Sequence, residues 1–332
     1  MYKKFLTISV AAYNAEKTLE KCLNSMVTAK NVDDIEIIVV NDGSKDRTLE
    51  IARSYAEKYP QSVIVIDKEN GGHGSTINAS VSRATGKYYK IVDSDDWVET
   101  ENLEKLVDTL KSDDVDLFVN SYFEADENGN HTNLISASNH IFEENIVYHF
   151  EDIALDFTEA HMHKMTFNAE LVKKMGPVID EHCFYVDIEY VGFLLAKVNT
   201  VKFLYYPVYD YLLGYEEQSV SKISMIKRRE QHKKVVSRMI DFYLSTKDTS
   251  NRSEFLRRYI SFVTRSQYMI YFNLPVTESK KEFSGFDKIV PDCFFDLPGV
   301  GKKMSVLIKL LRIKNYRFYI FLMTILKTLK MI

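Results

Sequence analysis

Three aspartates within four residues, Asp93, Asp95 and Asp96, are the strongest chemical signal in this sequence. They follow directly on residues 88–92, an apolar and aromatic run bounded by Gly86 that is typical of a short buried strand. Like charges this close repel one another unless a cation lies among them, and carboxylate oxygens are preferred ligands of Mg²⁺ and Mn²⁺. The pattern indicates a divalent-metal site at a strand end. The alternative is an acidic turn that caps the next helix.

The elements that must position these aspartates come from an alternation of strand and helix patterns. Residues 35–40, Ile-Glu-Ile-Ile-Val-Val, are almost continuously apolar, as expected for a central parallel strand. The same reasoning predicts strands at 5–10, 63–66, 88–92, 115–123 and 200–211, and helices at 19–26, 49–59, 75–84, 103–110, 169–175 and from 187 onward. Repeated strand–helix units favour a parallel sheet. Between residues 131 and 160 the pattern blurs, and we expect loops and short elements there that shape a substrate site.

Other polar and glycine residues end the neighbouring strands. Tyr13 follows the first strand, Asp42 the second, and the glycine-rich run 71–74 the third. Ligands of open α/β sheets bind outside the carboxyl ends of the strands, so these residues are expected near Asp93. Glycine lets the backbone approach a ligand closely, although no Gly-Lys-Ser/Thr follows that would make a P-loop. We expect one ligand site built from several strand ends.

Five short stretches resemble, in order and spacing, the motifs of the family 2 glycosyltransferases, which are inverting enzymes with a GT-A fold. The stretches are Ser-Val-Ala-Ala-Tyr-Asn at 9–14, Ile-Ile-Val-Val-Asn-Asp-Gly-Ser at 37–44, Glu-Asn-Gly-Gly at 69–72, Ala-Thr-Gly-Lys-Tyr at 84–88 and Val-Asp-Ser-Asp-Asp-Trp at 92–97. The resemblance covers roughly residues 4–215. It implies an α/β fold with a GT-A type, mostly parallel sheet flanked by helices in residues 1–215. A smaller, basic, helical C-terminal region would follow in residues 216–332.

The resemblance implies a nucleotide-diphosphate sugar as donor, usually UDP-linked. The donor-binding residues that it implies are Ala11, Tyr13, Asp42, Gly72, Asp93 and Ser94, with Ala11 in place of a proline common in the family. Asp95 would hold Mn²⁺ or Mg²⁺, and Asp93 and His163 are candidates for further ligands. Such an ion neutralises the charge that builds on the departing diphosphate. An arginine common in the family is absent at residues 76–78, Thr-Ile-Asn, and His73 or Lys87 could replace it.

The resemblance places the general base at Asp187, because an inverting transfer needs one group to deprotonate the acceptor hydroxyl. An expected helix N-terminus there favours the ionised carboxylate, and a simple N-cap aspartate is the alternative. Glu189 is the reserve candidate, with a solvated helix residue as its alternative. Trp97 and Tyr185 are candidates for stacking on the acceptor sugar, unless they pack in the core.

Two histidines, His161 and His163, stand two residues apart in an otherwise apolar stretch. On a strand they would face the same side and could reach the metal or the diphosphate. The alternative is a structural role for both.

Charge is unevenly distributed along the chain. Residues 1–220 hold 20 Lys and Arg against 38 Asp and Glu, whereas residues 221–332 hold 23 against nine. Residues 302–332 carry eight basic residues and no acid, interleaved with apolar residues. This composition is typical of an interfacial helix on an anionic membrane. The alternative is a terminal helix that packs on its own domain or a partner. With an acidic remainder and no recognition module, nucleic acid is not an expected partner.

We therefore expect a metal-dependent hexosyl- or N-acetylhexosaminyl-transferase that acts on a saccharide acceptor, lipid-linked, in bacterial surface polysaccharide synthesis. Three widely spaced cysteines and the absence of a signal-peptide pattern favour the cytoplasm, and the basic tail favours the inner face of the plasma membrane. A homodimer is a further expectation. The competing hypotheses are a non-catalytic sugar-nucleotide binding module and a nucleotidyltransferase.

Overall fold

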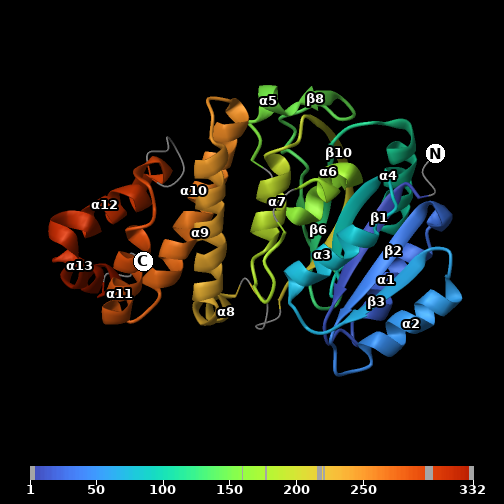
Figure 1. Ribbon diagram of the computed structural model, residues 1–332, viewed down its shortest axis with the longest axis horizontal. Coiled ribbons are helices and arrows are strands. Elements are labelled where there is room, and N and C mark those ends of the chain that lie inside the picture. The colour runs from blue at the N-terminus through green and yellow to red at the C-terminus, as the bar shows by residue number, and fades with distance from the viewer. Residues whose placement is uncertain are drawn as a thin grey trace. The chain divides into compact units, whose positions relative to one another are not determined.

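The computed structural model describes residues 4–158, 160–175, 178–214, 219, 221–295 and 302–328. The chain divides into two compact units, Met1–Tyr215 and Glu216–Ile332, and each is considered by itself. The first unit contains a large sheet with helices, and the second is helical (Figure 1).

A mixed sheet of ten strands forms the centre of the first unit. Its order is β3-β2-β1-β4-β9-β6-β10-β5, while β7 pairs with β6 and β8 pairs with β10. The strands are β1 (Leu6–Ala12), β2 (Ile35–Asp42), β3 (Val63–Lys68), β4 (Tyr88–Asp93), β5 (Trp97–Val98), β6 (Leu117–Ala125), β7 (His131–Ile135), β8 (Val147–His149), β9 (Met165–Asn168) and β10 (Thr200–Leu212). Six of them, β1 to β4, β6 and β10, are the strands that the sequence predicts.

The first four strands are parallel, with β1 between β2 and β4 and β3 beside β2. In this register Ala11 of β1 lies next to Val40 of β2 and Asp93 of β4, so the three strands end at one edge. The other half is mixed: β9 runs antiparallel between β4 and β6, and β6 is parallel to β10. The expected α/β architecture is confirmed. The short antiparallel strands β5, β7, β8 and β9 are additions that the sequence pattern did not predict.

Helices cover both faces of this sheet (Figure 1). On one face, α1 (Leu19–Val27), α2 (Thr48–Lys58) and α4 (Thr100–Ser112) share a core with Ile8 and Val10 of β1. On the other, α3 (His73–Arg83) hydrogen-bonds β1 through Ser80 and Ser9, whose Oγ atoms are 2.7 Å apart. Ser9 alternates with Ile8 and Val10, so the two sets of helices occupy opposite faces. The remaining helical segments are η1 (Val32–Asp34), α5 (Phe150–Ile153), η2 (Met162–Lys164), α6 (Ala169–Lys173) and α7 (Asp187–Leu195).

The described part of the second unit is built from helices. They are α8 (Lys222–Lys227), α9 (Arg229–Thr246), α10 (Asn251–Phe272), α11 (Val276–Asp287), η3 (Asp292–Phe294), α12 (Lys302–Tyr316) and α13 (Tyr319–Thr328). Aromatic side chains fill its core, where Tyr268 of α10 contacts both Phe283 and Phe286 of α11. In the residues that the structure describes, none of the helices is long and apolar enough to span a bilayer.

Candidate active site

The aspartates after β4 have different surroundings. Asp93 is partly exposed at the strand end, and Asp95 is exposed, whereas Asp96 is buried. The Asp96 carboxylate accepts hydrogen bonds from the Tyr209 hydroxyl and, at 2.8 Å, from the backbone N–H of Leu212. The Tyr209 hydroxyl in turn accepts a hydrogen bond from the backbone N–H of Asp93 at 3.2 Å. Asp96 and Tyr209 therefore fix the loop on β10 and leave Asp93 and Asp95 facing the site.

The imidazole of His73, at the start of α3, lies beside this loop. Its Nε2 atom lies 3.5 Å from Oδ1 of Asp93. Burial raises the pKa of Asp93 to about 6; His73 lowers this pKa, and Asp95 and Asp187 raise it. Removal from water also raises the pKa of Asp95, again with His73 acting in the opposite direction. These carboxylates therefore depend on neighbouring positive charge to stay ionised.

Asp187 is the first residue of α7, as the sequence predicts, and its side chain is exposed. The protein atoms crowded around its carboxyl raise its pKa, and His73 lowers it. An accessible carboxylate with a raised pKa, close to the aspartate loop, has the properties of a general base. Glu189 does not fit the reserve role, because it is completely buried and its Oε2 accepts a hydrogen bond from the backbone N–H of Asp180 at 3.0 Å.

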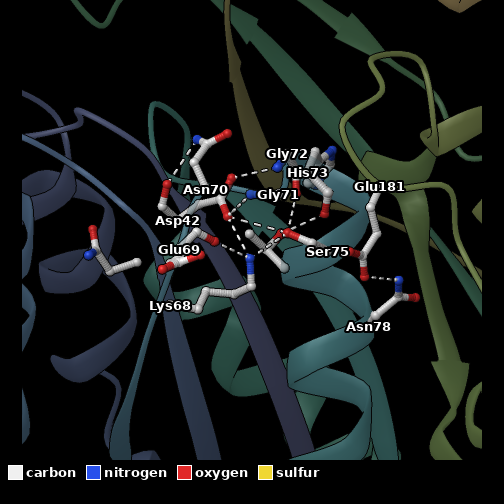
Figure 2. Close-up of polar contacts among 12 residues, drawn as sticks. Asp42, Lys68, Glu69, Asn70, Gly71, Gly72, His73, Ser75, Asn78 and Glu181 are labelled. Carbon is white, nitrogen blue, oxygen red and sulfur yellow. Dashed lines mark hydrogen bonds and ion pairs between the residues drawn. The ribbon is translucent and has the colours of Figure 1, made fainter.

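Asp42, at the end of β2, organises the loop between β3 and α3 (Figure 2). Its Oδ1 accepts hydrogen bonds from Lys68 Nζ and from the backbone N–H of Gly71, both at 2.9 Å. Its Oδ2 accepts a hydrogen bond from the backbone N–H of Gly72 at 2.8 Å, and Asn70 Nδ2 binds the Asp42 carbonyl oxygen at 2.9 Å. The carboxylate therefore holds the glycine-rich loop in place, a role that the sequence did not reveal.

The glycine-rich loop is also joined to the segment that leads to Asp187. The backbone N–H of His182 donates a hydrogen bond to the carbonyl oxygen of Gly71. Gly72 has a φ of +80°, and a Cβ at this position would lie 3.3 Å from the His182 nitrogen. His182 and Tyr185 adopt left-handed backbone angles, with φ of +52° and +68°, which cost non-glycine residues roughly 1 kcal/mol each. This strained, tightly packed connection fixes the donor-side loop and the candidate base relative to each other.

The opposite wall of the site contains the other expected donor residues. Tyr13 follows β1 with its side chain exposed, and Ser94 is buried within the aspartate loop. Asn14 joins this wall to the end of β2: its Oδ1 accepts a hydrogen bond from the N–H of Lys45 at 2.8 Å, and its N–H binds Ser44 Oγ at 3.0 Å. Ala11 lies beside Asp93. The structure thus gathers at one sheet edge the residues that the sequence assigned to the donor.

A divalent ion fits the residues at the end of β4. Ligand atoms of Asp93, Asp96 and His163 lie within 4.8 Å of one another. Nδ1 of His163 is buried and makes no hydrogen bond in the described part of the chain, and burial lowers the pKa of its imidazole to about 3. A neutral imidazole next to carboxylates is a suitable donor set for Mn²⁺ or a related ion. Since Asp96 already binds Tyr209 and Leu212, Asp93 and His163 are the members of this cluster that are left to hold an ion, and the exposed Asp95 stays an expected further ligand.

Three expectations about this region are wrong. His161 and His163 do not lie on a strand, because residues 162–164 form a short 3₁₀ turn ahead of β9. Trp97 is only 8% exposed and packs with Ala125 and Leu212, so an acceptor sugar cannot stack on its ring. Lys87 binds the Asp113 carbonyl oxygen at the opposite end of β4 and cannot reach donor phosphates.

Two aromatic residues that the sequence did not single out belong to the site. Tyr209 bonds the aspartate loop as described, and Tyr211 stacks on His163, with ring centroids 4.4 Å apart. Both come from β10, more than a hundred residues after the aspartates, and their spacing of two places them on one face. That alternation is the signal by which sequence reasoning could have found them.

The sequence matches a known protein family, and the match spans half of the chain. Residues 7–173 match the family described as glycosyl transferase family 2. Glycosyltransferase GlyA of Streptococcus pneumoniae is 36% identical over 122 residues, which are 37% of this chain and 17% of GlyA. The poly(ribitol-phosphate) beta-glucosyltransferase of Bacillus spizizenii is 35% identical over 34% of this chain and 18% of its own length. The matched region is thus less than a fifth of either relative.

Solved structures resemble almost the whole chain. Residues 1–349 of TarS from S. aureus, in complex with UDP-GlcNAc, give a TM-score of 0.70 at 19% identity, over 96% of this chain and 89% of that chain. The mannosyltransferase PcManGT from Pyrobaculum calidifontis, in complex with GDP-Man and Mn²⁺, gives 0.55 at 15% identity, over 99% and 88%. At these identities the likeness establishes the shared fold, which is the GT-A type that the sequence predicts.

Proposed function

The chain belongs to glycosyl transferase family 2, and on this premise we propose that it is an inverting, metal-dependent glycosyltransferase. The proposed donor is a UDP-linked sugar, and the proposed acceptor is a hydroxyl of a lipid-linked saccharide in surface polysaccharide synthesis. The observation that carries the proposal is that His73 Nε2 lies 3.5 Å from Asp93 Oδ1 and that the same imidazole acts on the carboxyls of Asp95 and Asp187. The TarS complex with UDP-GlcNAc supports the choice of nucleotide, and the poly(ribitol-phosphate) relative supports a polymeric acceptor.

The donor would lie across the ends of β1, β2 and β4. Tyr13 would offer its exposed ring to the nucleotide base, and Asp42 would hold the partly exposed Gly72 beside the diphosphate. Asp93, Asp95 and His163 would hold Mn²⁺ or Mg²⁺. When bound, such an ion neutralises the negative charge that develops on the leaving diphosphate, worth several kcal/mol of the barrier.

Asp187 would act on the acceptor. Its ionised carboxylate takes the proton from the acceptor hydroxyl, and that oxygen forms a bond to the anomeric carbon of the donor sugar. The bond between the anomeric carbon and the diphosphate oxygen breaks, and its electron pair leaves with the nucleotide diphosphate. Attack from the opposite face inverts the configuration at this carbon. Proton transfer by a positioned base is worth about 10²–10⁴-fold in rate. Tyr185, two residues away, is the proposed acceptor contact.

The C-terminal helices would bring the enzyme to its acceptor at an anionic membrane. One side of α12 and α13 packs inside the second unit: Arg312 Nε lies 2.8 Å from Asp287 Oδ2, and the Tyr319 hydroxyl lies 2.7 Å from Ser279 Oγ. The other side exposes apolar residues, namely Val306, Leu310, Ile313, Phe318, Ile320, Phe321 and Ile325. Apolar exposure next to basic residues suits a membrane interface. Packing and the proposed membrane contact would therefore use different residues of the same helices.

The function can be tested with a panel of nucleotide sugars. The purified protein should release nucleotide diphosphate from one of them in the presence of Mn²⁺ or Mg²⁺, with no release in EDTA. Asp187→Asn serves as the matched inactive control. Binding without turnover on any acceptor would indicate a non-catalytic binding module. Release of pyrophosphate from a nucleoside triphosphate would indicate a nucleotidyltransferase, and either result would overturn the proposal.

A further inference from the structure

We propose that Glu99, His131 and Asp210 bind a second divalent transition-metal ion, on the opposite face of β10 from the active site. The three residues come from separate segments of the first unit. Glu99 lies between β5 and α4, His131 is the first residue of β7, and Asp210 lies near the end of β10. Neither the proposed transfer reaction nor the donor site uses any of them.

The spacing of the potential ligand atoms suits a common ion. His131 Nε2 lies 2.7 Å from Asp210 Oδ1 and 3.4 Å from Glu99 Oε1. Ligand atoms of all three residues lie within 4.8 Å of one another. Two nitrogen or oxygen ligands at about 2.0–2.2 Å from one tetrahedral Zn²⁺ are themselves roughly 3.3–3.6 Å apart. The observed separations therefore need only small adjustments for all three residues to ligate one ion.

The Asp210 carboxylate is the independent reason to infer a cation here. The residue is completely buried, with 0% exposure. Neither of its oxygens has a hydrogen bond of good geometry from the described residues, and its close contact is His131 Nε2, 2.7 Å from Oδ1. Burial and the neighbouring Glu99 raise the pKa of Asp210 to about 7, and His131 lowers it. A buried carboxylate is strongly disfavoured in its charged form unless a positive charge compensates it. With Glu99 beside it, the cluster holds two carboxylates and one imidazole, a charge that a divalent ion balances.

The surrounding structure fixes the orientation of the cluster. The His131 ring stacks on Phe123 of β6, with ring centroids 3.9 Å apart and an angle of 11° between the planes. β10 pairs with β5 on one side and with β6 on the other. In these pairings Asp210 lies beside Trp97 of β5 and beside Phe123 of β6. An ion held here would join β5, β7 and β10 at one point. β5 and β7 are short antiparallel strands added to the sheet, and β10 is the strand that carries Tyr209.

The second site is distinct from the first because side chains alternate along β10. Tyr209 and Tyr211 contact His163 on the active-site face, with centroid distances of 4.7 and 4.4 Å. Asp210 lies between them and points to the other face. One imidazole with two carboxylates is a borderline donor set, which suits Zn²⁺, Co²⁺ or Mn²⁺ better than Ca²⁺. The competing candidate for the counter-charge is Lys21, whose Nζ lies 2.9 Å from the centroid of the Trp97 ring and whose pKa, lowered by burial, is raised by Asp210.

The experiment measures Zn²⁺ binding in a background in which the first site has lost one proposed ligand. Full-length Asp95→Asn protein, stripped with chelator and dialysed, should still bind one equivalent of Zn²⁺ and show a higher Tm with the ion. Adding His131→Gln should weaken this binding by more than ~100-fold and abolish the Tm increase. Adding His140→Gln instead is the matched control, because His140 stacks on Tyr205 away from the cluster, and it should change neither result.

The two metal sites can fail separately in this design. If Asp95→Asn protein binds no Zn²⁺, Asp210 is compensated by Lys21 and His131 and the second site is overturned, whatever the activity of the wild type. If His131→Gln and His140→Gln bind equally, the ion lies elsewhere and the proposal is also overturned. Glu99→Gln is a second test that spares the His131–Phe123 stack, and it should likewise weaken Zn²⁺ binding.

Discussion

The Nε2 atom of His73 lies 3.5 Å from Oδ1 of Asp93, at the point where α3 begins next to the end of β4. In its protonated form this imidazole lowers the pKa of Asp93, Asp95 and Asp187. Residues 76–78 lack the arginine that the family resemblance leads one to expect. We infer that His73 supplies the positive charge of the site, on the preceding turn of the same helix.

The first prediction concerns the pH dependence of His73→Gln. Asp187 must be ionised to act as a base, so kcat/KM falls as the pH drops through the pKa of its carboxyl. That pKa lies above the ordinary value of 3.8. Without the imidazole, the pKa of all three carboxyls rises, and the acidic limb of the kcat/KM profile should move to higher pH. His140→Gln, remote from the site, should leave the profile unchanged. An identical profile for His73→Gln would show that its charge does not act on the carboxylates.

The second prediction is that Asp187→Asn separates binding from transfer. The substitution keeps size and hydrogen-bonding capacity but removes basicity. Transfer should fall by ~10²-fold or more while the dissociation constant of the donor changes little. Steady-state rates and donor titrations of both proteins provide the measurement. Weakened donor binding with an unchanged kcat would instead assign Asp187 to the metal or donor site.

The third prediction is that Asp42→Asn loosens the glycine-rich loop. An amide cannot accept all four of the hydrogen bonds and ion-pair contacts that the buried carboxylate accepts from Lys68, Gly71, Gly72 and Ser75. We expect a loss of about 2 kcal/mol of unfolding free energy and a higher KM for the donor. Asp67→Asn is the matched control, because its ion pair with Arg53 at the end of β3 is exposed and worth at most ~1 kcal/mol. Equal denaturation midpoints and KM values for the two variants would contradict this role of Asp42.

The fourth prediction concerns the membrane side of the C-terminal helices. Phe321 is 65% exposed on α13, and Phe262 is 61% exposed on α10 of the same unit. Phe321→Glu should weaken co-sedimentation with anionic vesicles, because it puts a negative charge on the proposed contact surface. Phe262→Glu should sediment like the wild type, and high salt should weaken attachment of both. If both variants sediment equally with vesicles at low salt, the tail only packs within its own unit.

The sequence predicted the first half of the sheet well because its strands are continuously apolar and each is followed by a helix of clear periodicity. It could not predict β9, a four-residue antiparallel strand between β4 and β6, because nothing in so short a segment encodes its neighbours. The residues at the strand ends were found from their types alone. Their separate roles could not be predicted, because Asp93 and Asp96 look alike in the sequence. What distinguishes Asp96 is the hydrogen bonds that its carboxylate accepts from Tyr209 and Leu212 of β10.

Buried partners also decide between a catalytic and a structural role for acidic residues. Asp187 and Glu189 are two residues apart on α7, yet one is exposed and the other has no solvent exposure. The helical repeat predicts that Asp187 and Glu189 point in different directions from the helix axis. It does not predict which other element covers each of these two sides of α7. The hydrogen bond from Asp180 to Glu189 settles this and comes from the preceding segment, whose path the sequence pattern does not predict.

The most direct test of the account is the metal dependence of UDP binding, measured by titration calorimetry on wild-type and Asp95→Asn protein with Mn²⁺ or with EDTA. UDP is used because it probes the nucleotide site whichever sugar is transferred. We predict that wild-type protein with Mn²⁺ binds UDP at least ~10-fold more tightly than in EDTA, a difference of about 1.4 kcal/mol. Asp95→Asn should bind weakly in both conditions, while Asp187→Asn should behave as the wild type. Equal UDP affinity of wild-type protein with Mn²⁺ and with EDTA would contradict a metal-dependent donor site at the end of β4.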